Sequence, residues 1–157
     1  MSETAAQAVD DFVARGVFRA DGPKRRAATT VVWAVRWFGD HMMTLSAGPA
    51  SVAFDDVLPP LPAQSPLYRE LRAWLRAQQA AELPPHRRLD PARWPLEVKN
   101  RGGRLRIALG AQAPDGEAVR RLVQLVHALY LDFLGGPGRL HWVIDAFGLD
   151  PDNPRLR

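Results

Sequence analysis

Residues 95–110 read PLEVKNRGGRLRIALG and form the clearest hairpin pattern in the chain. Apolar and charged residues alternate on both sides of Gly102 and Gly103, a pattern that is typical of a β-hairpin with a tight glycine turn. We therefore expect a strand over residues 95–99 that pairs with a second strand over residues 104–110. One face of this hairpin carries Leu96, Val98, Leu105, Ile107 and Leu109, and the other carries Glu97, Lys99, Arg104 and Arg106.

The strongest helical pattern of the chain follows this hairpin. Asp115 is a suitable N-cap, and apolar residues then recur at 3.6-residue spacing up to Gly135. The pattern predicts a long helix that packs on the sheet. Its apolar positions are Val119, Leu122, Val123, Val126, Leu129, Tyr130 and Phe133. A shorter amphipathic helix over residues 140–147 stops at Gly148, and a polar tail begins at about residue 149.

Upstream of the hairpin, the sequence predicts two helices and three strands. Thr4 and Gln7 match a capping box that starts a first helix, and Ser65 followed by Pro66 is a typical start of a second helix, which ends before Pro84. Residues 29–38, 41–47 and 51–58 are rich in β-branched and apolar residues, as strands are. Residues 21–26, which end in one lysine and two arginines, are interpreted as a turn-rich connection.

Together these elements predict one α+β domain over residues 1–157, in the order α-β-β-β-α-β-β-α-α. The antiparallel sheet combines a three-strand meander with the hairpin, and helices pack on it. The length of 157 residues suits a single domain. The chain has no cysteine, which excludes disulfides and thiolate metal sites. Without a basic start, an apolar leader or a long apolar run, it is expected to be cytoplasmic, with no membrane partner.

Basic residues concentrate in one segment of the chain. Residues 69–106 hold ten basic and four acidic side chains, a net charge of +6, whereas the whole chain carries +4. A localised positive charge attracts anionic partners such as acidic peptides, nucleic acids or phosphate groups. An alternative interpretation is that these arginines only keep the surface soluble.

The order helix, three strands, helix, hairpin, helix over about residues 4–134 is similar to that of the class I type III secretion chaperones and the related YbjN-like domains. This resemblance implies a non-catalytic domain, often a homodimer, that holds a segment of a client protein. The present chain differs from those acidic chaperones in its basic charge, and it has an additional C-terminal helix.

The candidate contact residues lie in the basic segment. Tryptophan and arginine are enriched at binding hot spots, and Trp94 stands beside Arg93 at the mouth of the hairpin. The candidate partner-binding set is Arg87, Arg88, Arg93, Trp94, Arg104 and Arg106. The alternative interpretation of Trp94 is that its ring packs the loop onto the sheet.

Signals for catalysis or metal binding are few. His141 and Asp145 share a helical face, but such a pair is more often a structural hydrogen bond or an exposed ion pair. Asp55 and Asp56 point to opposite faces if their strand continues, unless a bulge intervenes. We find no phosphate-binding glycine loop, nucleophile elbow or paired-histidine zinc helix, and we expect no cofactor and no metal.

Three functions remain as hypotheses. The first is an accessory protein that binds a protein or acidic peptide, in the manner of a chaperone or carrier; an exposed sheet edge could receive an extended peptide while arginines select acidic side chains. The second is a nucleic-acid-binding domain that uses residues 69–106. The third is an enzyme whose active site is assembled from residues distant in sequence.

Overall fold

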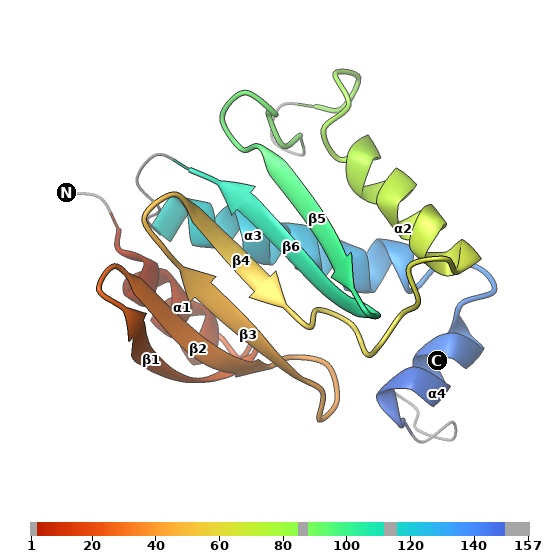
Figure 1. The fold of residues 1–157 in the computed structure, drawn as a ribbon, viewed down its shortest axis with the longest axis horizontal. Helices are drawn as coiled ribbons and strands as arrows, with labels where there is room; N and C mark the ends of the chain where they lie inside the picture. Colours follow the sequence, from red (N-terminus) through yellow and green to blue (C-terminus); the bar gives the residue numbers. More distant parts are fainter. Residues whose placement is uncertain (1–2, 85–87, 112–115, 150–157) are drawn as a thin grey trace.

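A computed structural model describes residues 3–84, 88–111 and 116–149 of the protein. Figure 1 labels the helices and strands in chain order. Their bounds are α1 Ala5–Ala14, β1 Arg19–Ala27, β2 Thr30–Arg36, β3 Met42–Ala47, β4 Ser51–Asp55, α2 Pro66–Ala77, β5 Leu96–Arg101, β6 Arg104–Gly110, α3 Gly116–Ala128 and α4 Leu140–Phe147. The predicted α+β fold with an antiparallel sheet is therefore confirmed.

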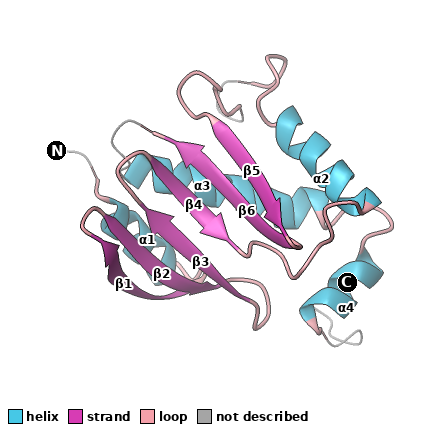
Figure 2. Ribbon diagram, in the orientation of Figure 1, coloured by secondary structure: helices cyan, strands magenta, loops and turns pink. Residues whose placement is uncertain are grey.

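All six strands belong to one antiparallel sheet with the order β1-β2-β3-β4-β6-β5. Helices α1 and α3 lie behind this sheet, and α2 lies beside β5 (Figures 1 and 2). No helix of the described residues covers the opposite face, which we call the open face. It carries Thr44 of β3, Asp55 of β4, Lys99 and Arg101 of β5, and Arg104 and Arg106 of β6.

The covered face of the sheet holds the hydrophobic core. Buried side chains alternate along the strands, as Trp33 and Val35 do in β2. Helix α3 packs its apolar face against these side chains, and the predicted burial of Leu122, Val126, Leu129 and Phe133 is confirmed. The open face is therefore free to carry polar residues.

Strand β1 was not predicted, because residues 21–26 read as a turn. The structure places them in a strand that pairs with β2, with shifts of register between Asp21 and Lys24 and between Arg25 and Ala27. Eight of its nine residues are exposed. A strand with so little burial has no apolar alternation by which a sequence could reveal it. The meander therefore has four strands instead of three.

The long predicted helix is divided into two parts. After α3 the chain makes one π-helical turn over Leu129–Phe133, with Leu134 as its C-cap. Within this turn the hydroxyl of Tyr130 donates a hydrogen bond of 2.9 Å to the carbonyl of Val57. Because Val57 lies two residues after the end of β4, this bond ties the C-terminal part of the helix to the end of that strand.

Candidate functional site

The hairpin turn fixes the position of two arginines on the open face. Gly102 and Gly103 have φ angles of 61° and 91°, and a two-residue turn with positive φ at both positions places the flanking residues directly opposite each other. Arg101 is accordingly paired with Arg104. The Asn100 side chain accepts a hydrogen bond from the Gly103 amide and donates one to the carbonyl of Leu61, which anchors the turn.

A bulge at the end of β4 brings two carboxylates to the same face. The amides of Asp56 and Val57 both point to the carbonyl of Leu105, at 2.9 and 3.4 Å, so two residues of one strand oppose one residue of the other. Asp56 has a φ of 59°, and the His41 ring donates a hydrogen bond of 2.6 Å to its carbonyl. The predicted strand over residues 51–58 thus ends at Asp55, and the bulge allowed by the sequence is present.

The two carboxylates bind the two arginines of β6. Arg104 donates two hydrogen bonds to Asp56, of 2.9 and 2.6 Å, and Arg106 donates one of 2.7 Å to Asp55. The hydrogen bond from Arg104 holds the pKa of Asp56 below its ordinary value of 3.8, against the opposing effect of partial burial. Both guanidinium groups are therefore fixed in place over the sheet.

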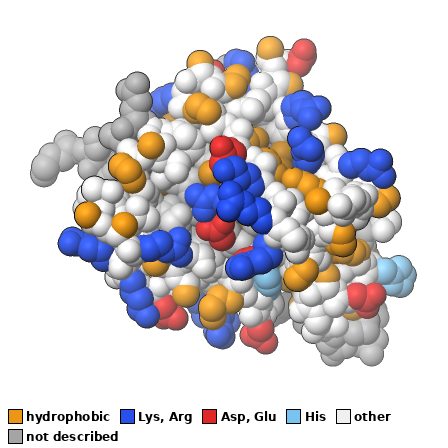
Figure 3. All heavy atoms as spheres, viewed as in Figure 1, with side chains coloured by type: hydrophobic (Ala, Val, Ile, Leu, Met, Phe, Trp, Pro, Cys, Tyr) orange, Lys and Arg blue, Asp and Glu red, His pale blue; other side chains and the backbone are white. Residues whose placement is uncertain are grey.

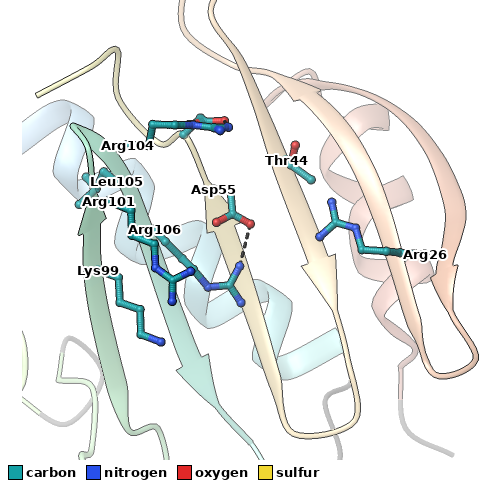
Figure 4. A pocket seen from close by; sticks show the side chains of 9 residues that line it. Arg26, Thr44, Asp55, Lys99, Arg101, Arg104, Leu105 and Arg106 are labelled. Atoms are coloured by element: carbon teal, nitrogen blue, oxygen red, sulfur yellow. Dashed lines mark hydrogen bonds and ion pairs between the residues drawn. The ribbon is translucent and has the colours of Figure 1, made fainter.

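These residues surround a groove of about 500 Å³, which we call the arginine groove. Figure 3 shows a cluster of basic side chains, bordered by acidic ones, in the middle of the open face. Figure 4 shows the lining side chains from close by, with Arg26 of the edge strand β1 reaching toward Thr44. The lining residues are Arg26, Thr44, Asp55, Asp56, Lys99, Arg101, Arg104, Leu105 and Arg106.

Five cations and two carboxylates give the arginine groove an excess of positive charge. Lys99 is 3.3 Å from Glu97, and both of these side chains are well exposed. Among the residues that the structure describes, Arg26 and Arg101 have no ion-pair partner. These two guanidinium groups are available to an anion from outside, because no carboxylate of the described residues pairs with them.

The structure divides the predicted partner-binding residues into two groups. Arg104 and Arg106 line the arginine groove, whereas Arg88, Arg93 and Trp94 line a separate cavity of about 370 Å³ near the start of β5. The two groups are separated by the length of that strand, about 20 Å for six residues. Arg87 lies outside the described residues.

Trp94 is a core residue, in agreement with the alternative interpretation of the sequence. Its side chain is 6% exposed, and the carbonyl of Trp94 accepts a hydrogen bond from Gln79. The guanidinium of Arg93 lies 5.0 Å from the ring centroid and also donates a hydrogen bond of 2.7 Å to Glu117. Arg93 therefore fastens the loop to α3 and covers the tryptophan ring.

The remaining arrangements singled out in the sequence form no reactive cluster. His141 and Asp145 both lie on α4, and no hydrogen bond joins their side chains in the described part of the chain. Across residues 3–84, 88–111 and 116–149, no three His, Asp or Glu side chains are placed to hold a metal ion. No described helix is long and apolar enough to cross a membrane.

Three of the five cations that line the arginine groove were not among the predicted site residues. Arg26 was missed because its segment read as a turn, and Lys99 and Arg101 were noted only as part of the basic segment. In comparisons with protein-family models, curated proteins and solved structures, the chain has no match. The chemistry of the arginine groove therefore has to be judged from its own residues.

Proposed function

We propose that the protein is a non-catalytic accessory protein, chaperone- or carrier-like, that binds an acidic segment of a partner protein in the arginine groove. The observation that carries this proposal is the convergence of Arg26 and Arg101, neither with an internal ion-pair partner in the described residues, on a groove already rich in cations. A guanidinium group binds a carboxylate through two parallel hydrogen bonds, which gives orientation as well as affinity.

Carboxylates suit this groove better than nucleic acids do. Arg104 already holds the carboxylate of Asp56 in a bidentate arrangement, so the groove itself contains an example of the interaction. Proteins that bind single-stranded nucleic acids stack the bases on aromatic side chains, and no lining residue of this groove is aromatic. A carboxylate needs no such platform.

The binding of a labelled hexaglutamate peptide, measured by fluorescence anisotropy, tests the proposal. We expect the Arg26→Glu/Arg101→Glu variant to bind the peptide about 100-fold more weakly, because hydrogen bonds to charged groups contribute about 1.5–3 kcal/mol each. The matched control is Arg69→Glu/Arg88→Glu, which changes the net charge by the same amount away from the arginine groove. It should retain most of the affinity.

Equal losses in both variants would mean that the peptide responds only to net charge, and the arginine groove would be rejected as the site.

The competing nucleic-acid hypothesis predicts a different result with an oligonucleotide. A thymidine oligonucleotide with six phosphates should bind more weakly than hexaglutamate. If it binds more tightly, and loses roughly a hundredfold or more in affinity between about 50 and 200 mM salt, the protein is a nucleic-acid-binding domain.

A further inference from the structure

The two edges of the sheet differ in their capacity to pair with another strand. At the β1 edge, Pro23 lacks an amide hydrogen, the register shifts twice, and Lys24 and Arg25 are exposed. Proline, bulges and lysine are the features by which edge strands resist pairing. At the opposite edge, β5 pairs with β6 over six residues without a shift of register. β5 is therefore the edge that could accept a further strand.

The hydrogen-bonding pattern shows which backbone groups of β5 point outward. Arg101 and Arg104 flank the two-residue turn, and at the other end of the strand the amide of Gly110 donates to the carbonyl of Pro95 at 2.8 Å. Hydrogen-bonded and non-hydrogen-bonded pairs alternate in an antiparallel ladder. The amides and carbonyls of Leu96, Val98 and Asn100 therefore point away from β6.

A groove of about 200 Å³ lies between this edge and α2, and we call it the edge groove. Leu75, Leu96 and Val98 supply its apolar surface, and Gln79 also lines it. Arg72 and Arg76 stand at its α2 side and have no ion-pair partner within the described residues. An extended chain beside β5 would find apolar contacts as well as positive charge.

We infer that the acidic partner segment binds as a seventh strand on β5, with acidic residues alternating with apolar ones; this rests on the proposed function. Side chains of a strand point alternately to the two faces of a sheet. One row of the added strand would face Leu96 and Val98 in the edge groove. The other row would lie beside Lys99 and Arg101 on the open face, where acidic side chains are favoured by cross-strand pairing.

Two peptides of the same composition test this inference. In the first, four glutamates alternate with three valines; in the second, the four glutamates precede the three valines. Charge alone would not favour the alternating peptide, because the block peptide has the same net charge at a higher local density. Strand addition requires the alternation, and we expect the alternating peptide to bind at least about tenfold more tightly, a difference of about 1.4 kcal/mol.

A backbone variant tests whether the peptide pairs with β5 itself. Val98→Pro removes an outward amide hydrogen and no hydrogen bond to β6, which is the position where an edge strand tolerates proline. The variant should bind the alternating peptide no better than the block peptide, and should bind hexaglutamate as the unmodified protein does. Val98→Thr keeps the amide and is the control. An alternating peptide with N-methylated valines makes the same test if Val98→Pro does not fold.

The outcomes separate the two proposals. If the two peptides bind equally and Arg26→Glu/Arg101→Glu still weakens hexaglutamate binding, strand addition is wrong and the arginine groove stands. If hexaglutamate does not bind but the alternating peptide does, and Val98→Pro abolishes that binding, the edge is the site and the arginine groove is not. If sedimentation shows a dimer that Val98→Pro dissociates, a second copy of the chain occupies the edge, and the inference is wrong.

Discussion

Arg104 binds Asp56 through two hydrogen bonds although the two residues are 48 positions apart in the chain. Asp56 is also held by the His41 ring and by the hydrogen bond from its amide to Leu105. A residue other than glycine with a positive φ persists where its surroundings fix it at several points. The positive φ of Asp56 costs free energy, and the bulge places the Asp56 carboxylate in the arginine groove.

This pair predicts a dependence of stability on pH. The folded protein has an Asp56 pKa below 3.8, so the stabilisation is complete above pH 3.8 and is lost as the pH falls through the folded-state pKa. Asp56→Asn removes the titrating group and keeps a side chain that tolerates positive φ. We expect the urea midpoints of the two proteins to converge below pH 3.8. The control Asp40→Asn changes an exposed residue, and its urea midpoint should stay close to that of the unmodified protein. If the midpoints of Asp56→Asn and the unmodified protein do not converge at low pH, the prediction is wrong.

Tyr130→Phe should destabilise the protein by about 1–3 kcal/mol, because the carbonyl of Val57 loses its buried hydrogen-bond donor. Tyr68→Phe is the matched control. The Tyr68 side chain is also buried, and its hydroxyl makes no hydrogen bond to any described residue. Chemical denaturation of both variants checks this prediction, and equal free energies of unfolding would show that the Tyr130 bond contributes nothing.

Val126→Asp places an unpaired charge in the fully buried face of α3. We expect a loss of at least about 3 kcal/mol, which corresponds to a fall of roughly 6–12 °C in Tm for a domain of this size. Gln124→Asp introduces the same charge at an exposed position of the same helix and should change Tm little. An unchanged thermal transition for Val126→Asp would disprove the packing of α3 on the sheet.

Thr4→Ala removes the hydroxyl that accepts a hydrogen bond of 3.1 Å from the Gln7 amide at the start of α1. The expected cost is about 1 kcal/mol, because the first turn of the helix loses its capping partner. Thr29→Ala makes the same chemical change in the exposed turn between β1 and β2. Urea titrations should show a loss for the first variant alone.

Features set by neighbouring residues could be predicted from the sequence. The hairpin turn at Gly102 and Gly103, the capping box at Thr4 and the start of α2 at Ser65 all depend on residues within a few positions. Their physical causes are the positive φ angles of the two glycines and the capping of free amides at the helix starts. Both causes act between residues that are close in sequence. These elements were therefore found with the correct residues.

Features that depend on distant partners could not be predicted. The bulge at Asp56 requires the carbonyl of Leu105, and Arg26 enters the arginine groove only because β1 pairs with β2. Trp94 illustrates the same limit, since only the packed structure shows that Arg93 covers its ring. The sequence indicated a basic surface, but not which arginines meet on it.

The difference between the two sheet edges also limits how large an assembly can become. Polymerisation through strand pairing needs two competent edges on every subunit, one to receive and one to pass on the contact. Here β1, with Pro23 and its two shifts of register, resists that contact. If a partner segment pairs with β5 as proposed, the array should end there with a stoichiometry of one to one, because the β1 edge opposes a further pairing.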